Sequence, residues 1–332
     1  MLPISKTITQ APAQLLILFA TLALFLITNA IFGGNNSLNF IPILIAILIV
    51  IEILVFVAIE VKEGTKKHGW KHEIVDTLLA LLIAVVIWYG VSFILNTNSP
   101  ISGVVSCSML PNLQRGDFIL VQGALANAYE IEMTEQELDS LTSDAIIHYE
   151  GSNFTIKGSI FSYCIYNQKA ELCQFFVDSP EKIIEEKGAF TYKYERCSLS
   201  YSDGGNATLP CLSSVTFKNH EYLTNFSHDT IVYASPKDHL YSLIGDIVHR
   251  AMFKINVGDE TYYLTRGDNN PILDLQVYDY GRDLTNAPVS EEYVRGKVIA
   301  RIPILGYFKL FISGYLQEDS QCRTQLDFTH IS

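Results

Sequence analysis

The stretch that decides the fold spans residues 104–121 and reads VVSCSMLPNLQRGDFILV. Two serines, Ser106 and Ser108, stand ahead of Pro111, and an Arg-Gly-Asp turn at residues 115–117 leads into a short apolar strand. Because proline fixes its own backbone angle, the bend that carries Ser108 is held in shape. A serine held in this way is well placed to act as a nucleophile, provided that a base lies beside it.

The residues before this stretch predict a membrane region. The chain has 332 residues, of which 49% are hydrophobic, and its mean hydropathy is +0.22. A membrane-spanning helix needs roughly 20 apolar residues. Three windows meet that length, at residues 15–32, 40–59 and 75–95. We therefore expect a three-helix transmembrane region over residues 1–98.

The charges between these windows predict how the chain crosses the bilayer. The linker at residues 60–73 contains four lysines, whereas the linker at residues 33–39 is uncharged. Positive charge marks the cytoplasmic side. The N-terminus is then cytoplasmic, and the chain after residue 95 is extracytoplasmic. Glu52, inside the second window, is either a protonated side chain bonded to the neighbouring helix through Thr28 or Asn29, or a contact to a partner subunit.

The extracytoplasmic part is interrupted by a polar stretch at residues 124–227. It contains four of the six cysteines and three N-x-S/T sequons, which fit an exported surface. We favour disulfides over free thiols there, and we leave the state of Cys107 and Cys322 open. No C-x-x-C pair or histidine cluster indicates zinc. The stretch is interpreted as an inserted disulfide-bearing subdomain, and the net charge of -12 argues against a nucleic-acid partner.

Apolar strands flank the insertion and form a mainly β core, expected at residues 99–123 and 228–316, with a tail at 317–332. The segment 246–255 reads DIVHRAMFKI, and its period of two places His249 on an apolar face. The segment 264–275 reads LTRGDNNPILDL, in which a Gly-Asp-Asn-Asn turn is followed by Pro271 and then Asp274. Ser108, His249 and Asp274 supply the nucleophile, base and orienting acid that a hydrolytic triad needs.

Four segments together resemble the type I signal peptidases. The serine box at residues 106–111, VHR at 248–250, TRGDNN at 265–270 and a glycine-rich box at 296–306 occur in the order of that family. Histidine in VHR is similar to the archaeal and endoplasmic-reticulum type, because bacterial relatives carry lysine there. Cys107 departs from the usual glycine, and Asn112 departs from a small residue or threonine.

The resemblance implies a small coiled or open β-barrel and a serine endopeptidase that removes signal peptides. Ser108 would attack, His249 would take its proton, and Asp274 would orient His249. Asp268 is the second candidate for the orienting acid, and Lys254 is a rival base if a bulge turns it inward. The Ser108 N–H and the Ser106 hydroxyl would bind the oxyanion.

The substrate would be an extended peptide that pairs along a strand just outside the membrane. The residues expected to line it are Phe118, Ile119, Leu120 and Val121. Signal-peptide-bearing pre-proteins and the lipid bilayer are the expected partners, with the secretion translocon as a further candidate, and no cofactor is expected. The expected location is an archaeal cell membrane, with the endoplasmic reticulum as the alternative. The competing interpretations are a non-catalytic binding module that uses the insertion, and a peptidase dedicated to one surface protein.

Overall fold

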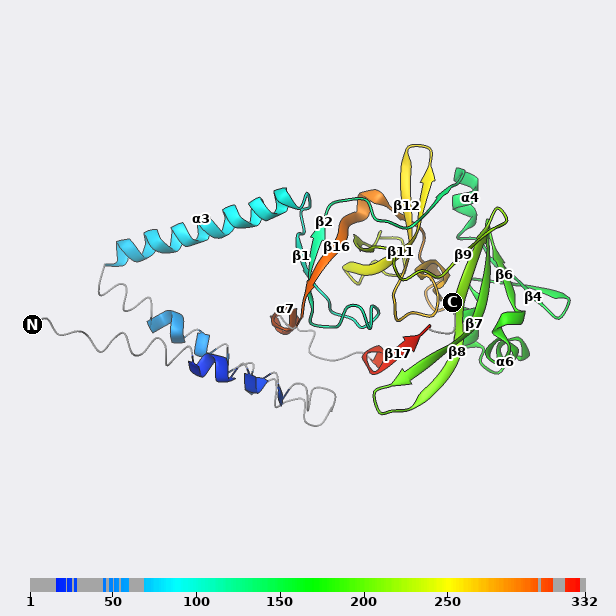
Figure 1. The fold of residues 1–332 in the computed structure, drawn as a ribbon, viewed down its shortest axis with the longest axis horizontal. Coiled ribbons are helices and arrows are strands. Elements are labelled where there is room, and N and C mark those ends of the chain that lie inside the picture. Colours follow the sequence, from blue (N-terminus) through cyan, green and yellow to red (C-terminus); the bar gives the residue numbers. More distant parts are fainter. Residues whose placement is uncertain are drawn as a thin grey trace, which may run out of the picture. The chain divides into compact units, whose positions relative to one another are not determined.

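The computed structural model describes residues 16–21, 23–25, 27–28, 44–45, 48–49, 51–53, 55–59, 69–303, 306–312 and 320–328 (Figure 1). The chain divides into two compact units, Met1–Val91 with Phe311–Glu318, and Ser92–Leu310 with Asp319–Ser332. The second unit is built almost entirely from antiparallel sheets. The prediction of a mainly β domain is therefore confirmed.

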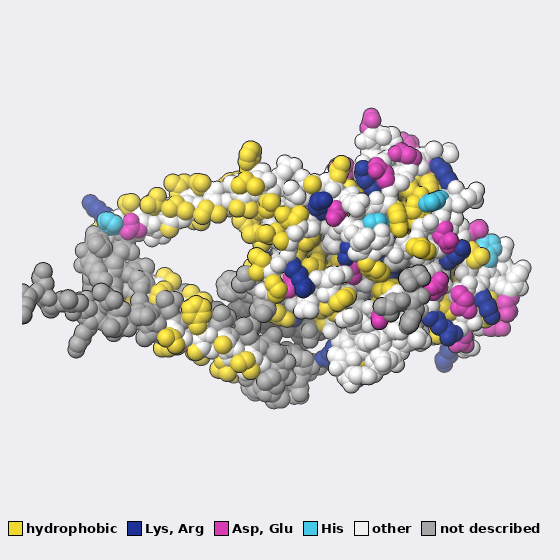
Figure 2. Space-filling view, viewed as in Figure 1, with side chains coloured by type: hydrophobic (Ala, Val, Ile, Leu, Met, Phe, Trp, Pro, Cys, Tyr) yellow, Lys and Arg dark blue, Asp and Glu magenta, His cyan; other side chains and the backbone are white. Residues whose placement is uncertain are grey.

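One helix in the described part of the chain is long and apolar enough to cross a membrane. It is α3, Trp70–Ile94, with 25 residues, and it begins five residues before the predicted third window. Hydrophobic side chains cover it in Figure 2. The other two windows are described only in part, so the structure supports one of the three predicted spans. A shorter apolar helix, Leu16–Phe25, falls in the first window.

Glu52 has a partner that the sequence did not suggest. Its Oε2 accepts a hydrogen bond of 2.7 Å from the Thr21 hydroxyl. Thr28, one of the two expected partners, instead donates to the backbone carbonyls of Leu24 and Phe25. The expectation of a bond through Thr28 was therefore wrong, whereas a bond from Glu52 to a residue of the first window is present.

The larger sheet carries the candidate site. Its strand order is β1-β2-β16-β10-β11-β12-β15, and β3 pairs with β11. The bounds are Ile101–Gly103 (β1), Phe118–Gln122 (β2), Tyr129–Glu132 (β3), Thr230–Ala234 (β10), Asp246–Val257 (β11), Glu260–Arg266 (β12), Val289–Ser290 (β15) and Val294–Ile302 (β16). On β2 and β10, which both pair with β16, the side chains of Ile119, Val121 and Val232 are fully buried. They pack with Met109 and Leu113, which ties the Ser108 loop to the sheet.

The second sheet is formed mainly by the residues of the predicted insertion. Its order is β5-β4-β6-β7-β8-β9, and β17 from the C-terminal segment pairs with β7. The bounds are Ala145–Tyr149 (β4), Ser152–Ile156 (β5), Ile184–Lys187 (β6), Phe190–Tyr201 (β7), Asn206–Phe217 (β8), His220–Leu223 (β9) and Thr324–Asp327 (β17). Buried side chains of this sheet, such as Tyr192 and Phe217, share one core with Phe253 and Leu264 of the first sheet. The insertion thus packs on the first sheet through a common core.

Short elements complete the domain. One of them is helix α4, Glu135–Ser140, which begins with a capping box in which Thr134 and Glu137 satisfy each other's backbone N–H groups. The remaining elements are α5 (Ile160–Tyr166), α6 (Glu171–Asp178), α7 (Gly306–Ile312), β13 (Tyr278–Asp279), β14 (Leu284–Thr285), η2 (Pro180–Lys182), η3 (Asp274–Gln276), η4 (Glu291–Tyr293) and η5 (Ser320–Arg323).

Strand β11 departs from strict alternation. The register with β12 shifts between Ala251 and Phe253, which marks a bulge. As a result Met252 and Phe253 are both buried in the same core cluster, although a period of two places them on opposite faces. His249 precedes the bulge, so its inward orientation follows the predicted period.

Candidate active site

Ser108 lies in the loop between β1 and β2, and this loop is held at both ends. The Gly116 N–H donates to the Val104 carbonyl, and the Val104 N–H donates to the Asp117 carbonyl, each over 2.9 Å. Gly116 has φ +89°, and a Cβ there would lie 2.3 Å from the Tyr307 ring, so only glycine fits. The Leu110–Pro111 peptide bond is cis. The serine is 8% exposed.

His249 lies between Ser108 and Asp274. Its Nε2 is 3.0 Å from the Ser108 Oγ, and its Nδ1 is 2.6 Å from the Asp274 Oδ2. The imidazole is 5% exposed and the acid is 3% exposed. The structure therefore brings together three side chains that lie on a loop, on β11 and at the start of η3, with the geometry of a nucleophile, a base and an orienting acid.

The carboxylate of Asp274 is itself oriented by its neighbours. Its Oδ2 accepts hydrogen bonds from the Thr265 hydroxyl (2.6 Å) and from the Tyr233 hydroxyl (3.4 Å). The Asn286 side-chain amide donates to the Asp274 backbone carbonyl over 3.0 Å. Burial, and then the nearby Asp274 charge, raise the pKa of Tyr233 well above its usual value, so its hydroxyl remains a donor. Thr265, Tyr233 and Asn286 were missed in the sequence, although Thr265 lies inside the TRGDNN box.

Asp268, the second candidate for the orienting acid, lies in a different network. Both of its carboxylate oxygens accept hydrogen bonds of 2.6 Å from Arg250. Its Oδ2 also accepts from the Asn112 amide over 2.7 Å. The acid that contacts His249 is Asp274, and Asp268 instead joins the VHR strand to the serine box. Asn112, noted in the sequence as a departure from the family pattern, provides one end of that link.

Two groups near Ser108 can donate a hydrogen bond to an oxyanion. The Ser106 Oγ is 3.2 Å from the Ser108 Oγ. The Ser108 backbone N–H donates to no other group in the described part of the chain. Both donors are thus near the position where a tetrahedral intermediate would develop its negative charge.

Lys254, the rival base, is engaged elsewhere. Its ammonium group contacts the Glu130 carboxylate over 2.9 Å, and hydrogen bonding to Glu130 raises its pKa above the usual value. A lysine in this state stays charged and is a poor proton acceptor. Among the described residues, no group of three or more His, Cys, Asp or Glu side chains could hold a metal ion.

The strand expected to bind the substrate is not open. Phe118, Ile119 and Leu120 of β2 pair with β1 on one side and with β16 on the other. The Val121 N–H donates to the Pro100 carbonyl over 2.9 Å. The expectation for these residues was therefore wrong, because the strand order places β2 inside the sheet. Among the described strands, β1 lies at one edge of this sheet, and it leads directly into the Ser108 loop.

The cysteine pairing is also defined. The insertion contains Cys164–Cys173 and Cys197–Cys211, so the disulfides expected there are present. The third disulfide joins Cys107 to Cys322. It attaches the C-terminal segment to the residue next to Ser108, a link that nothing in the sequence decided.

Comparisons with known proteins point to one family. No protein-family model matches the chain. The signal peptidase complex catalytic subunit SEC11 of Metarhizium robertsii is 37% identical over 67 residues, which are 20% of this chain and 37% of the relative. The subunits of the same name from Sclerotinia sclerotiorum and Neurospora crassa are 36% and 37% identical over 67 residues, with the same coverage.

The matched stretch spans little more than a third of the length of these curated relatives. The resemblance predicted from the four boxes in the sequence is thus confirmed: over the matched stretch the chain is similar to signal peptidase complex catalytic subunits of the SEC11 type.

Proposed function

We propose that the protein is a membrane-bound serine endopeptidase that cleaves signal peptides from exported pre-proteins. The observation that carries the proposal is the buried line from the Ser108 Oγ through His249 to Asp274, with contacts of 3.0 and 2.6 Å. The binding-module alternative requires the serine and histidine to be out of reach of each other, at more than about 5 Å, whereas hydrogen-bond reach is roughly 2.6–3.2 Å. The observed contact favours catalysis.

The chemistry follows from which atoms face each other. The Ser108 Oγ attacks the scissile carbonyl while the His249 Nε2 takes its proton and later passes it to the leaving amine. Asp274 holds the Nδ1–H tautomer and stabilises the imidazolium that forms. The Thr265 hydroxyl, 2.6 Å from the same carboxylate oxygen, fixes the orientation of the acid.

Two donors would stabilise the oxyanion. The Ser108 N–H has no hydrogen-bond partner among the described residues, and the Ser106 Oγ lies 3.2 Å from the Ser108 Oγ. Removing one donor from an oxyanion hole typically lowers the rate by about 10²–10³-fold. Ser106 is therefore assigned a supporting role that is smaller than that of Ser108.

An extended substrate fits the free edge of β1. Ile101–Gly103 is the outermost strand of its sheet and ends five residues before Ser108. An exposed edge offers unpaired backbone groups to an added strand. A peptide paired with β1 can therefore reach the nucleophile without displacing another strand. Small side chains before the cut are expected from the family resemblance.

The face of the sheet beside β1 suits a lipid surface. Cross-strand partners on β1, β2 and β16 form apolar rows, Ile101–Leu120–Ala300 and Gly103–Phe118–Ile302. Ile101, Ile299 and Ile302 are 40–46% exposed, and Figure 2 shows hydrophobic side chains gathered over this part of the sheet. Exposed apolar area of this kind is typical of contact with a bilayer or a partner.

The membrane and the partners follow from these points. Helix α3 is the proposed anchor, and pre-proteins whose signal peptide lies in the same bilayer are the proposed substrates, with the translocon as a further candidate partner. The three relatives reported above come from fungi. This source favours the endoplasmic reticulum over the archaeal membrane that was expected first.

The test uses the full chain in vesicles with a reporter pre-protein whose cleavage site carries small residues. We expect release of the mature reporter by wild type, and no release from a matched reporter with a bulky residue before the cut. The His249→Ala variant should insert stably and release nothing above the buffer rate. Equal cleavage of both reporters, or cleavage by His249→Ala, would sink the proposal.

A further inference from the structure

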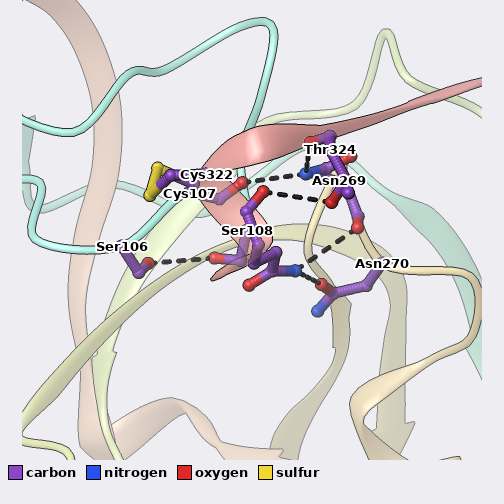
Figure 3. Close-up of a disulfide and its surroundings, with 8 residues drawn as sticks. Ser106, Cys107, Ser108, Asn269, Asn270, Cys322 and Thr324 are labelled. Atoms are coloured by element: carbon purple, nitrogen blue, oxygen red, sulfur yellow. Dashed lines mark hydrogen bonds between the residues drawn. A yellow bond between two sulfur atoms is a disulfide. The ribbon is translucent and has the colours of Figure 1, made fainter. Parts of the chain in front are cut away.

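The C-terminal segment Ser320–Phe328, which we name the C-terminal clamp, grips the nucleophile loop. Its Cys322 forms a disulfide with Cys107, 215 residues away and directly before Ser108. Its strand β17 pairs with β7, with Thr324 opposite Tyr201 and Asp327 opposite Ser198. The residue before the nucleophile is thus covalently joined to Cys322 of η5, two residues before β17 begins (Figure 3).

Asn269 links the clamp to the nucleophile loop by hydrogen bonds. Its backbone N–H donates to the Ser108 carbonyl over 2.7 Å. Its side-chain amide donates to the Cys107 carbonyl (3.2 Å) and to the Thr324 carbonyl (2.9 Å), and its Oδ1 accepts from the Leu326 N–H (2.7 Å). Asn269 is only 4% exposed. A single buried side chain therefore bridges the loop and the clamp, as Figure 3 shows.

Further contacts hold the clamp against the turn that carries Asn269. The Gln321 amide donates to the Asn270 Oδ1 over 2.8 Å. The Phe328 ring lies 4.5 Å from the buried Arg266 guanidinium, which itself donates to the Asn270 carbonyl over 2.8 Å. A Cβ on Gly267 would lie 2.6 Å from the Ser108 carbonyl oxygen. The turn and the nucleophile loop are thus in close contact, and the clamp covers both.

The position of the clamp matters because of the geometry of one peptide unit. The Cys107 carbonyl and the Ser108 N–H belong to the same planar, trans peptide group. Fixing the carbonyl oxygen therefore fixes the direction of the N–H at its other end. Asn269 holds that oxygen, together with a weaker bond of 3.3 Å from the Leu110 N–H.

We propose that Asn269 and the Cys107–Cys322 disulfide are positioning elements that aim the Ser108 N–H at the oxyanion. This inference rests on the proposed peptidase function. The clamp touches neither the base nor the acid of the site in the described contacts, so its loss lowers kcat and leaves KM nearly unchanged. The disulfide thus links the nucleophile loop to the clamp, whose strand β17 is hydrogen-bonded to β7 of the second sheet.

The experiment compares wild type with Cys322→Ser, Asn269→Asp and a control lacking a different disulfide, Cys164→Ser with Cys173→Ser. Asn269→Asp keeps the size of the side chain but replaces a donor to two carbonyls with an acceptor. We expect kcat to fall about 10-fold in Cys322→Ser and about 10²–10³-fold in Asn269→Asp, the range for loss of an oxyanion donor. The KM of the control should stay within twofold of the wild-type value, and its kcat should not change. Its thermal midpoint should stay within a few degrees of that of wild type.

Hydrogen exchange of residues 104–117 provides a readout that does not need activity. Local opening is expected to increase exchange of this loop in Cys322→Ser and Asn269→Asp, but not in the control. Unchanged kcat in both folded variants, or a loss confined to KM, would overturn the clamp proposal. Should wild type itself fail to cleave, the peptidase function fails, and faster exchange of the loop still supports the clamp while unchanged exchange refutes it.

Discussion

Replacing Asp274 by Asn separates the electrostatic role of the acid from its shape. The variant keeps the size of the side chain but cannot hold the His249 Nδ1–H and both hydroxyl donors in the same arrangement. If the new amide nitrogen takes the Oδ2 position, it faces the His249 nitrogen at 2.6 Å and the Thr265 hydroxyl at 2.6 Å. If it takes the Oδ1 position, its two N–H groups enter a place where the carboxylate oxygen has no partner among the described residues.

Both arrangements carry a clear cost. The first forces the wrong imidazole tautomer, and the second buries unsatisfied donors, which costs about 1–3 kcal/mol. In a chymotrypsin-like triad the same change lowers kcat about 10⁴-fold. Since each tenfold in rate corresponds to about 1.36 kcal/mol, we expect a loss of about 10³–10⁴-fold, or about 4–5.5 kcal/mol, in kcat for Asp274→Asn.

The assay measures single-turnover cleavage of the reporter pre-protein in vesicles at saturating enzyme. Asp283→Asn is the matched control, because Asp283 is an exposed acid paired with Lys157 over 2.8 Å and has no contact with the triad in the described residues. The control should retain its rate within twofold. A loss smaller than 10-fold in folded Asp274→Asn would refute the assignment of Asp274 as the orienting acid.

Three further predictions concern the surroundings of the site. Arg250→Met removes the buried partner of Asp268 and should lower the free energy of unfolding by about 3–5 kcal/mol, measured by urea titration, because it leaves an uncompensated carboxylate; a change below about 1 kcal/mol would contradict this. Gly267→Ala should lower kcat at least 10-fold, because the new Cβ would lie 2.6 Å from the Ser108 carbonyl oxygen. The control Gly205→Ala, whose new Cβ would have its nearest contact at 3.3 Å, should keep the wild-type kcat. Equal activity of the two variants would argue against the close contact at Gly267. Burial lowers the pKa of His239 from its ordinary 6.5, so its neutral form stabilises the fold above pH 6.5 and this stability is lost as the pH falls. Between pH 7.5 and pH 5.5 the thermal midpoint of His239→Gln should therefore fall less than that of wild type. Parallel curves of thermal midpoint against pH would exclude the effect.

The sequence pointed to the three side chains that the structure brings into contact, because local patterns place them. The period of two in β11 placed His249 inward, and the spacing of the TRGDNN box provided an acid at residue 274. The choice between Asp268 and Asp274 could not be made from spacing. It depends on Arg250, whose side chain donates two hydrogen bonds of 2.6 Å to the Asp268 carboxylate.

Other features depend on contacts that no local pattern encodes. The strand order puts β2 between β1 and β16, although its apolar residues look the same at an edge or inside a sheet. The bulge in β11 moves Met252 and Phe253 into one cluster, against the predicted alternation. The Cys107–Cys322 disulfide joins residues 215 positions apart, and cysteine counts alone cannot assign a pairing.

The central claim is that Ser108 is the nucleophile of a signal-peptide-cleaving enzyme. The most direct measurement is mass spectrometry of the Ser108-containing peptide after rapid acid quench of wild type with excess reporter pre-protein. The account predicts an ester-linked signal-peptide fragment on Ser108, absent in Ser108→Ala, together with loss of all reporter cleavage in that variant. Continued cleavage by folded Ser108→Ala, or an adduct on another residue, would contradict it.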